Sequence, residues 1–178
     1  KALIKEFAGK VAGFQHMEFE LSGQDVVDVA AEQVFGAGAR TDFDFEKAEV
    51  IVSFGADYLE TWLSPVRFAR GWAAGRKRAE VSRVIHVEPR LSLTAGNADQ
   101  WVRNNPGSET RIQLALLKMV VDKAGAKVSG AARQKIDAVL SSSMVGGQDT
   151  NKLLAQTGVS SGLLEKIAEE LLKRPSLV

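Results

Sequence analysis

The chain has 178 residues, of which 45% are hydrophobic and 25% are charged, and these ordinary globular values exclude a disordered tail, a collagen-like chain and a low-complexity protein. Its 23 Lys and Arg residues balance its 22 Asp and Glu residues, and no predicted helix gathers the basic side chains on one face, so we expect no nucleic acid partner. Because the chain has no cysteine, it can supply no thiolate zinc site, no iron–sulfur cluster and no disulfide.

Short β-rich runs alternate with helical patterns in the middle of the chain, which is typical of parallel βαβ units. We predict strands at His16–Leu21, Glu49–Gly55 and Arg83–Pro89, and a short edge strand at Trp101–Asn104. The runs at 49–55 and 83–89 are nearly continuously apolar, as expected for strands that are covered on both faces.

Apolar residues at helical spacing predict helices at Gln24–Phe35, at Pro65–Ala79 and from Ser108 to about Lys123. Beyond Gly125 the pattern indicates helices only, at residues 131–140, 150–156 and 161–173, leading to a further strand at Ser176–Val178. None of these runs is long and apolar enough to span a bilayer, and we expect no direct membrane insertion.

Together these patterns predict an α/β fold, a Rossmann-like three-layer domain with a parallel sheet and a C-terminal helical extension. We assign residues 1–124 to the dinucleotide-binding-type domain and residues 125–178 to a helical extension of the same domain. Because the chain starts at Lys1 without a methionine and stops where an apolar run begins, we also expect it to be a piece of a longer protein; the alternative is that either end is a natural processing product or a short tail.

The loops that follow the predicted strands are the places to look for a ligand, since ligands of open parallel sheets bind beyond the carboxyl ends of the strands. These loops are residues 55–62, 88–99 and 104–109, and we expect them to meet at one rim. The last of them leads into a helix whose free N-terminal amides favour an anion or a hydrogen-bond acceptor.

Glu88 closes a strand in the way that ribose-binding acids do in dinucleotide folds. The alternative is that Glu88 pairs locally with Arg90 or caps a neighbouring helix, and Asp57 and Glu60 face the same choice. Gly55 is more informative, because a glycine at the end of a buried strand lets a ligand or another backbone approach closely.

The histidines and tryptophans give weaker signals. His86 lies inside a predicted buried strand and His16 begins one, so neither is a good candidate for a general base. Trp62 lies in a rim loop, where it could stack on a planar ligand or pack in the core.

Three segments carry a resemblance to a known family. Residues 48–62, residues 87–90 with 97–99, and residues 106–109 resemble in order and spacing the large subunit of molybdopterin oxidoreductases. The likeness covers residues 42–123 and is greatest to the branch that includes the molybdopterin-oxidoreductase-like subunit of alternative complex III. The resemblance implies a doubly wound α/β domain that helps to hold a molybdopterin guanine dinucleotide.

The family's motifs match this sequence residue by residue in three loops. The loop usually written Gly-Ser-Asn-Pro-Ala-Glu corresponds to residues 55–60, the Asp-Pro-Arg motif to residues 88–90, and the Arg-Pro-Gly-Thr-Asp loop to residues 105–109. The resemblance therefore implies the following cofactor-binding candidates: Gly55, Ala56, Asp57, Glu60, Glu88, Arg90, Pro106, Gly107, Ser108 and Glu109.

Two departures from the family pattern affect the same rim. Asp57 stands where an amide is usual, which replaces a donor and acceptor by an acceptor-only anion, and Asn105 stands where an arginine is usual. Both changes oppose the binding of a dinucleotide that carries pyrophosphate charge. They favour a vestigial pocket, which the alternative-complex branch also suggests.

The resemblance implies partners as well as a cofactor. They are the remaining domains of a parent subunit and the iron–sulfur and membrane subunits of a redox complex, periplasmic or membrane-associated. We expect no catalytic residue and no metal ligand in this chain, which should not be catalytic alone. Two functions stay open: a contribution to a guanine-dinucleotide pocket, or a non-catalytic scaffold of a respiratory complex.

Overall fold

A computed structural model describes residues 2–17, 19, 25–39, 41–141 and 149–178. The described chain divides into two compact units, residues 1–42 and 43–178. The first unit contains helix α1 (Ala2–Ala8), which the sequence did not predict, and helix α2 (Asp25–Phe35), which it did. The assignment of residues 1–124 and 125–178 to a domain and its extension stays a prediction.

The strand predicted at residues 16–21 is wrong where the structure describes it. His16, Met17 and Phe19 lie in no strand, and residues 18, 20 and 21 lie outside the described residues. A short alternating run is not sufficient for a strand, because a strand needs a neighbour to bond its backbone.

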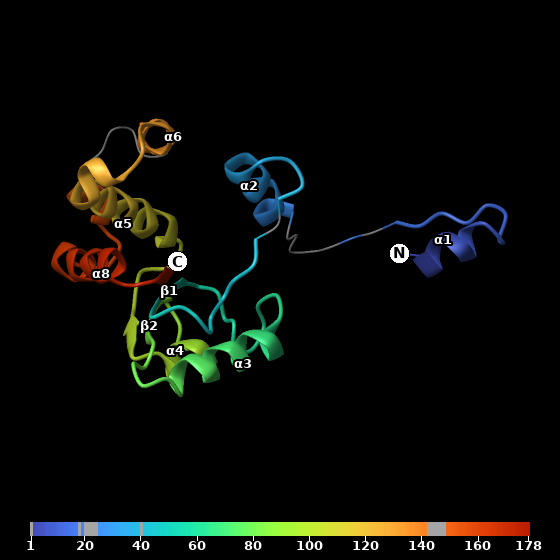
Figure 1. Cartoon of the computed structure of the whole chain (residues 1–178), viewed down its shortest axis with the longest axis horizontal. Coiled ribbons are helices and arrows are strands. Elements are labelled where there is room, and N and C mark those ends of the chain that lie inside the picture. The colour runs from blue at the N-terminus through green and yellow to red at the C-terminus, as the bar shows by residue number, and fades with distance from the viewer. Residues whose placement is uncertain (1, 18, 20–24, 40, 142–148) are drawn as a thin grey trace. The chain divides into compact units, whose positions relative to one another are not determined.

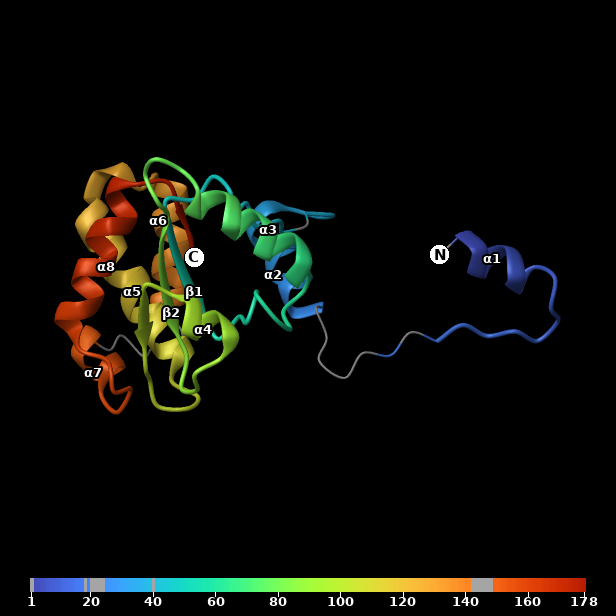
Figure 2. The same cartoon turned by 90° about the horizontal axis from the view of Figure 1, so that it is seen from below.

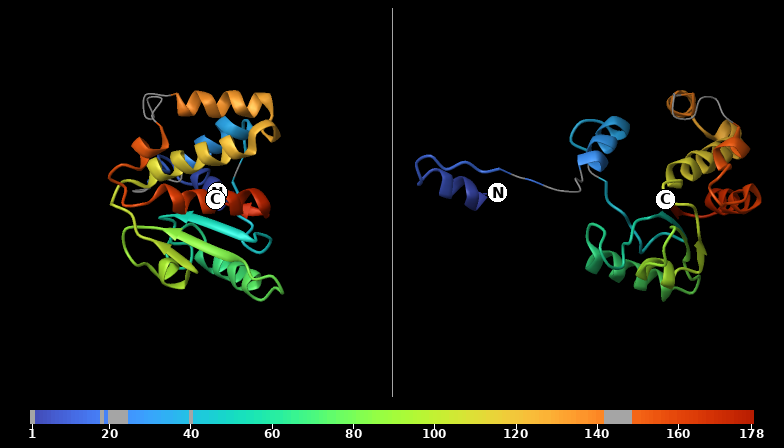
Figure 3. Two further views of the ribbon diagram at one scale, coloured as in Figure 1. Left: turned by 90° about the vertical axis from the view of Figure 1, so that its left-hand side faces the viewer. Right: turned by 180° about the vertical axis from the view of Figure 1, so that it is seen from behind.

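The second unit is built on a parallel sheet with the strand order β3-β2-β1-β4 (Figures 1 and 3). The strands are β1 (Val50–Phe54), β2 (Arg83–Val87), β3 (Gln100–Val102) and β4 (Ser176–Leu177). β1 pairs with β2 along its whole length, whereas β4 pairs only with Val50 and Ile51. The strands predicted from apolar runs are therefore confirmed, with shorter bounds.

Among the described residues of this unit, seven helical segments connect these strands: α3 (Pro65–Arg76), α4 (Leu93–Asn97), α5 (Glu109–Ala124), the 3-10 turn η1 (Gly125–Lys127), α6 (Gly130–Leu140), α7 (Thr150–Leu154) and α8 (Ser161–Lys173). The predicted helices are confirmed within a few residues at each end. The short helix α4 was not predicted. It begins at Ser92, whose hydroxyl accepts from the Ala95 amide.

The helices cover both faces of the sheet, so the unit has three layers. On one face, Ile51 and Val84 pack with the α3 side chain Phe68 and with Phe45 and Tyr58. On the other face, the core combines strand residues with residues of α5, α7 and α8, and its largest fully buried members include Val50, Val52, Ile85, Val87, Ile112, Leu153, Leu164 and Ile167. Figure 2 shows these layers on either side of β1 and β2. This confirms the predicted three-layer α/β fold with its helical extension.

Removing the Phe68 ring should destabilise this unit strongly. Phe68 is 4% exposed, and its ring centroid lies 4.9 Å from that of Phe45 and 5.6 Å from that of Trp62. We expect Phe68→Ala to lower the free energy of unfolding by about 3–5 kcal/mol, as measured by urea denaturation. Val66→Ala, on the same helix at an 83% exposed position, is the matched control and should change it little. Equal losses in the two variants would contradict this account of the core.

Candidate functional site

The loops after β1, β2 and β3 leave the sheet at the same edge, because the strands are parallel. We call this edge, formed by residues 55–62, 88–93 and 103–108, the carboxyl edge. It is where the sequence predicts a common rim, and it is where α/β sheets of this kind bind ligands.

The loop after β1 turns sharply at Gly55. This residue has a φ of +63°, a conformation that favours glycine, and its amide donates to the carbonyl of Val87 on the neighbouring strand. The carbonyl of Asp57 then accepts from the amides of Glu60, Thr61 and Trp62. The turn brings the Asp57 side chain inward and leaves Glu60 exposed.

The Asp57 carboxylate is 3% exposed and is bonded on both oxygens. Its Oδ1 accepts from the Thr94 amide at 3.2 Å and from the Thr94 hydroxyl at 2.6 Å, and its Oδ2 lies 3.5 Å from Nη2 of Arg90. Thr94 Oγ1 in turn accepts from the Leu59 amide. These hydrogen bonds hold the N-terminus of α4 against the loop after β1.

The Glu88 carboxylate is 5% exposed and is also bonded on both oxygens. Oε1 accepts from Nε of Arg90 at 3.1 Å, and Oε2 lies 3.2 Å from Nε2 of His86. The Glu88 carbonyl accepts from the Trp101 indole at 2.8 Å. We refer to Asp57, His86, Glu88, Arg90 and Thr94 as the carboxylate network.

The network carries a net negative charge. His86 is fully buried, and burial lowers its pKa, although the hydrogen bond to Glu88 opposes that shift. A neutral His86 donates from Nε2 to Glu88, and its buried Nδ1 has no partner among the described residues. Two carboxylates therefore face one guanidinium, that of Arg90, whose side chain is 64% exposed.

The loop after β3 forms a separate cluster at the same edge. The Asn104 amide donates to Ser108 Oγ and to Glu109 Oε1, both at 3.0 Å, and Ser108 donates to the Asn105 carbonyl at 2.6 Å. The Asn105 side chain donates to the Gln156 carbonyl beyond α7. Glu109 thus places its own carboxylate at the N-terminus of α5, where an anionic ligand would bind.

The structure brings together some of the residues predicted for the site and not others. Asp57, Glu88 and Arg90 meet directly, with Gly55 and Ala56 in the turn that positions Asp57. The hydrogen bonds described for the loop of Pro106, Gly107, Ser108 and Glu109 join this loop to itself and to residues 156–157. The sequence analysis did not single out Thr94. Ser92 is a helix-start signal, and it could have placed Thr94 in the first turn of a helix.

Asp99, which lies in a segment that carries the family resemblance, acts at the opposite end of the strands. Its carboxylate accepts from the Val84 amide at 2.8 Å and binds the Arg76 guanidinium through two hydrogen bonds, at 2.6 and 2.8 Å. This pairing fixes α3 to the start of β2 and β3. Asp99 is therefore a structural residue here.

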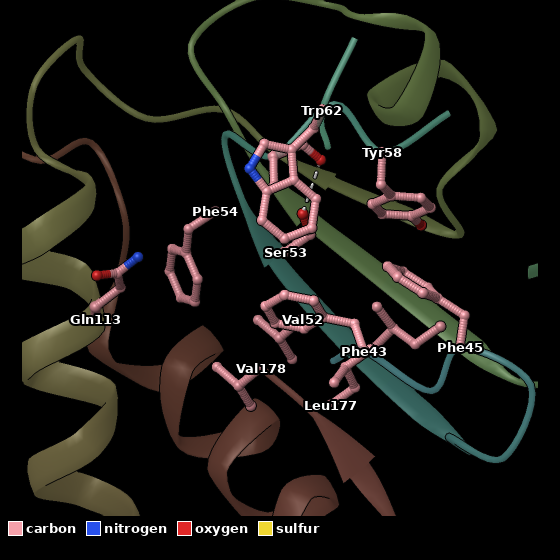
Figure 4. Close-up of a pocket in the computed structure, with 12 residues that line it drawn as sticks. Phe43, Phe45, Val52, Ser53, Phe54, Tyr58, Trp62, Gln113, Leu177 and Val178 are labelled. Atoms are coloured by element: carbon pink, nitrogen blue, oxygen red, sulfur yellow. Dashed lines mark hydrogen bonds between the residues drawn. The ribbon is translucent and has the colours of Figure 1, made fainter. Parts of the chain in front are cut away.

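An apolar pocket of about 160 Å³ lies beside β1, next to β4 (Figure 4). Tyr58 is 1% exposed at its wall, with its ring 4.5 Å from that of Phe45, and burial raises the pKa of the Tyr58 hydroxyl. Trp62 packs on Phe43 at 5.0 Å. Tyr58 and Trp62 therefore pack with core aromatics, and the Trp62 ring belongs to the pocket wall.

Two further properties concern the described ranges. In these ranges, no group of three or more His, Cys, Asp or Glu side chains is arranged to hold a metal ion. No helix there has the length and the apolar character needed to cross a bilayer.

The structure defines a three-layer α/β domain with a parallel sheet. Acetylene hydratase from Pelobacter acetylenicus has a similar structure, with a TM-score of 0.62 and 15% identity over 85% of this chain and 20% of that one. At this identity the likeness concerns the fold alone. No protein-family model matches the chain.

Two curated proteins are similar to this chain in sequence. The menaquinone reductase molybdopterin-binding-like subunit of Nitratidesulfovibrio vulgaris is 28% identical over 157 residues, which is 87% of this chain and 22% of that protein. The arsenate respiratory reductase molybdopterin-containing subunit ArrA of Shewanella sp. is 31% identical over 74 residues, which is 42% of this chain and 8% of that protein. The names of both proteins refer to molybdopterin, so these similarities support the family resemblance that the motifs predict, and the chain spans less than a quarter of either relative.

Replacing Thr94 should test the carboxylate network. Thr94→Val keeps the shape of the side chain but removes the donor to Asp57 and the acceptor for the Leu59 amide. We expect a loss of about 1–3 kcal/mol in unfolding free energy by urea denaturation, because buried polar groups lose their partners. Thr61→Val, at an exposed position of the neighbouring loop, is the control. A loss no larger than that of the control would show that the network is dispensable.

The buried His86 should make stability depend on pH. Its folded pKa lies below the unfolded value of 6.5, so the unfolded chain binds more protons between these two values. The contribution of His86 is therefore complete above about pH 6.5 and is lost as the pH falls through the folded pKa. We expect the melting temperature to decrease from pH 7.5 to 5.5, and to decrease less in His86→Gln, which donates to Glu88 but does not titrate. Identical pH profiles would refute this role.

Proposed function

We propose that this chain is a domain of a molybdopterin oxidoreductase family large subunit and acts in an electron-transfer complex as a non-catalytic scaffold whose dinucleotide-type edge is closed by its own side chains. One observation carries the proposal: Asp57 and Glu88 are buried, and every carboxylate oxygen of the pair has a partner within the protein. Acids that bind a ribose need free oxygens to accept from its hydroxyls.

The charge at the carboxyl edge supports the same conclusion. A pyrophosphate would meet the net negative carboxylate network and the Glu109 carboxylate at the start of α5. Asn105 stands where the family has an arginine, and its amide is directed to the Gln156 carbonyl. The residues present do not fit a molybdopterin guanine dinucleotide.

The second candidate function is a contribution to a guanine-dinucleotide pocket, and one observation favours it. Gly55 and Gly107 both have positive φ, and a Cβ atom on either would meet no heavy atom within 4 Å. Open space at these turns would let a ligand approach the backbone. We prefer the scaffold function for the following reason. The positive φ of the two turns is enough to explain both glycines, so they do not require a ligand. A pocket open to a ligand, in contrast, would not explain why Asp57 and Glu88 are buried and paired.

The names of the two relatives also suggest which partners the parent subunit has. Both relatives are named as subunits of reductases, so we propose that the parent subunit joins other subunits of a redox complex. By family resemblance these would be iron–sulfur and membrane subunits, as in the alternative complex III branch. The remaining domains of the parent subunit would be the nearest partners of this domain.

The decisive measurement is an elemental and pterin analysis of the parent protein purified without oxygen. We expect molybdenum and tungsten far below one atom per subunit, and no pterin fluorescence after acid oxidation. The ArrA subunit, whose name states that it contains molybdopterin, is the positive control. One metal atom with pterin per parent subunit would overturn the scaffold function and favour the pocket.

A further inference from the structure

The Glu88 carboxylate has a different side-chain partner on each of its two oxygens. Oε1 accepts from Nε of Arg90 at 3.1 Å, and Oε2 lies 3.2 Å from Nε2 of His86. Glu88 and His86 are buried, whereas the Arg90 side chain is 64% exposed. One buried carboxylate is therefore shared between a guanidinium at the surface and an imidazole in the interior.

The second described contact of Arg90 is weaker. Its Nη2 lies 3.5 Å from Oδ2 of Asp57, which is longer than an ordinary hydrogen bond. Asp57 also accepts from the amide and the hydroxyl of Thr94, so it stays hydrogen-bonded without Arg90. The position of the Arg90 guanidinium therefore depends mainly on Glu88.

We infer that His86 and Arg90 form a pH-sensitive switch, in which protonation of His86 neutralises Glu88 from the interior and releases Arg90 to bind a small oxyanion at the carboxyl edge. With a neutral His86, two carboxylates face one guanidinium, and the carboxylate network is negative. With a charged His86, two cations balance the two carboxylates. The added proton thus weakens the hold on Arg90 and also removes the net charge that repels an anion.

Among the described residues, three charged groups act on His86. They are Glu88 and Arg90, which follow β2, and Asp57, which follows β1. The residues in register with His86 on β1 and β3 are a serine and a tryptophan, and α4 has no ionisable side chain. The switch therefore lies within the carboxylate network, and it is compatible with either candidate function.

Burial sets the pH range of the switch. It has the largest effect on His86 and lowers its pKa, while Glu88 and Asp57 raise the pKa and Arg90 lowers it further. We therefore expect the switch to operate below the ordinary histidine value of 6.5. Because Arg90 opposes the protonation of His86, an anion that draws Arg90 away should in turn favour that protonation.

Titration of the full-length parent subunit with sulfate, by isothermal calorimetry at pH 7.5 and pH 5.0, tests the switch. Sulfate keeps the same charge at both pH values, which phosphate does not. We expect sulfate to bind at least about fivefold more tightly at pH 5.0. Equal or weaker binding at pH 5.0 would refute the switch, whatever the metal and pterin analysis shows.

Three single substitutions assign the effect to its groups. His86→Gln donates to Glu88 but does not titrate, so it should lose the pH dependence, and Arg90→Gln should bind sulfate weakly at both pH values. Arg103→Gln removes an exposed cation beyond β3, outside the carboxylate network, and should behave as the wild type does. A pH dependence that persists in His86→Gln or Arg90→Gln would also refute the switch. The wild-type comparison decides even where a variant does not fold.

Discussion

The structure of the carboxyl edge depends on one guanidinium that joins two buried carboxylates. Charges of this kind are costly to bury unless each is paired and hydrogen-bonded, and removing a partner leaves a buried anion uncompensated. Arg90 meets Asp57 and Glu88 while most of its own side chain stays exposed. Because these acids follow different strands, their common partner, together with Thr94, holds the loop after β1 to the segment that leads into α4.

This arrangement changes what the edge can do. In a dinucleotide-binding domain, the acids and amides at the strand ends bind the ligand, so they must be unpaired or only weakly paired when the ligand is absent. Here the same positions bond to one another, and a ligand would have to break at least one of these contacts before it gained its own. The carboxylate at position 57, where the family has an amide, contributes directly to this closure of the edge, because an asparagine could not form an ion pair with Arg90.

The sequence predicts the strands better than it predicts the contacts of the site. Residues 50–54 and 83–87 are apolar runs buried on both faces, so their pattern alone identifies them, and the parallel sheet then places Asp57 and Glu88 at one edge. The alternating run at residues 16–21 shows the limit, because its described residues, His16, Met17 and Phe19, lie in no strand. The bond between Thr94 and Asp57 spans 37 residues and depends on where the short helix α4 docks, which no local pattern specifies. His86 is a buried histidine as predicted, and its bond to Glu88 follows from the two-residue spacing, which puts both side chains on the same side of the chain at the end of β2.

The two sides of β1 differ in a way that follows from topology. Along the chain, β2 and then β3 are added on one side of β1. The chain then passes through α5 to α8 and places β4 on the other side of β1, so the strand order reverses between β1 and β4. In open sheets the ligand crevice lies at this reversal. In this domain the reversal is lined by Phe45, Phe54 and Tyr58, and its polar side chains, such as Ser53, bond to the protein itself. A crevice lined mainly by these apolar side chains suits an apolar group better than a charged nucleotide.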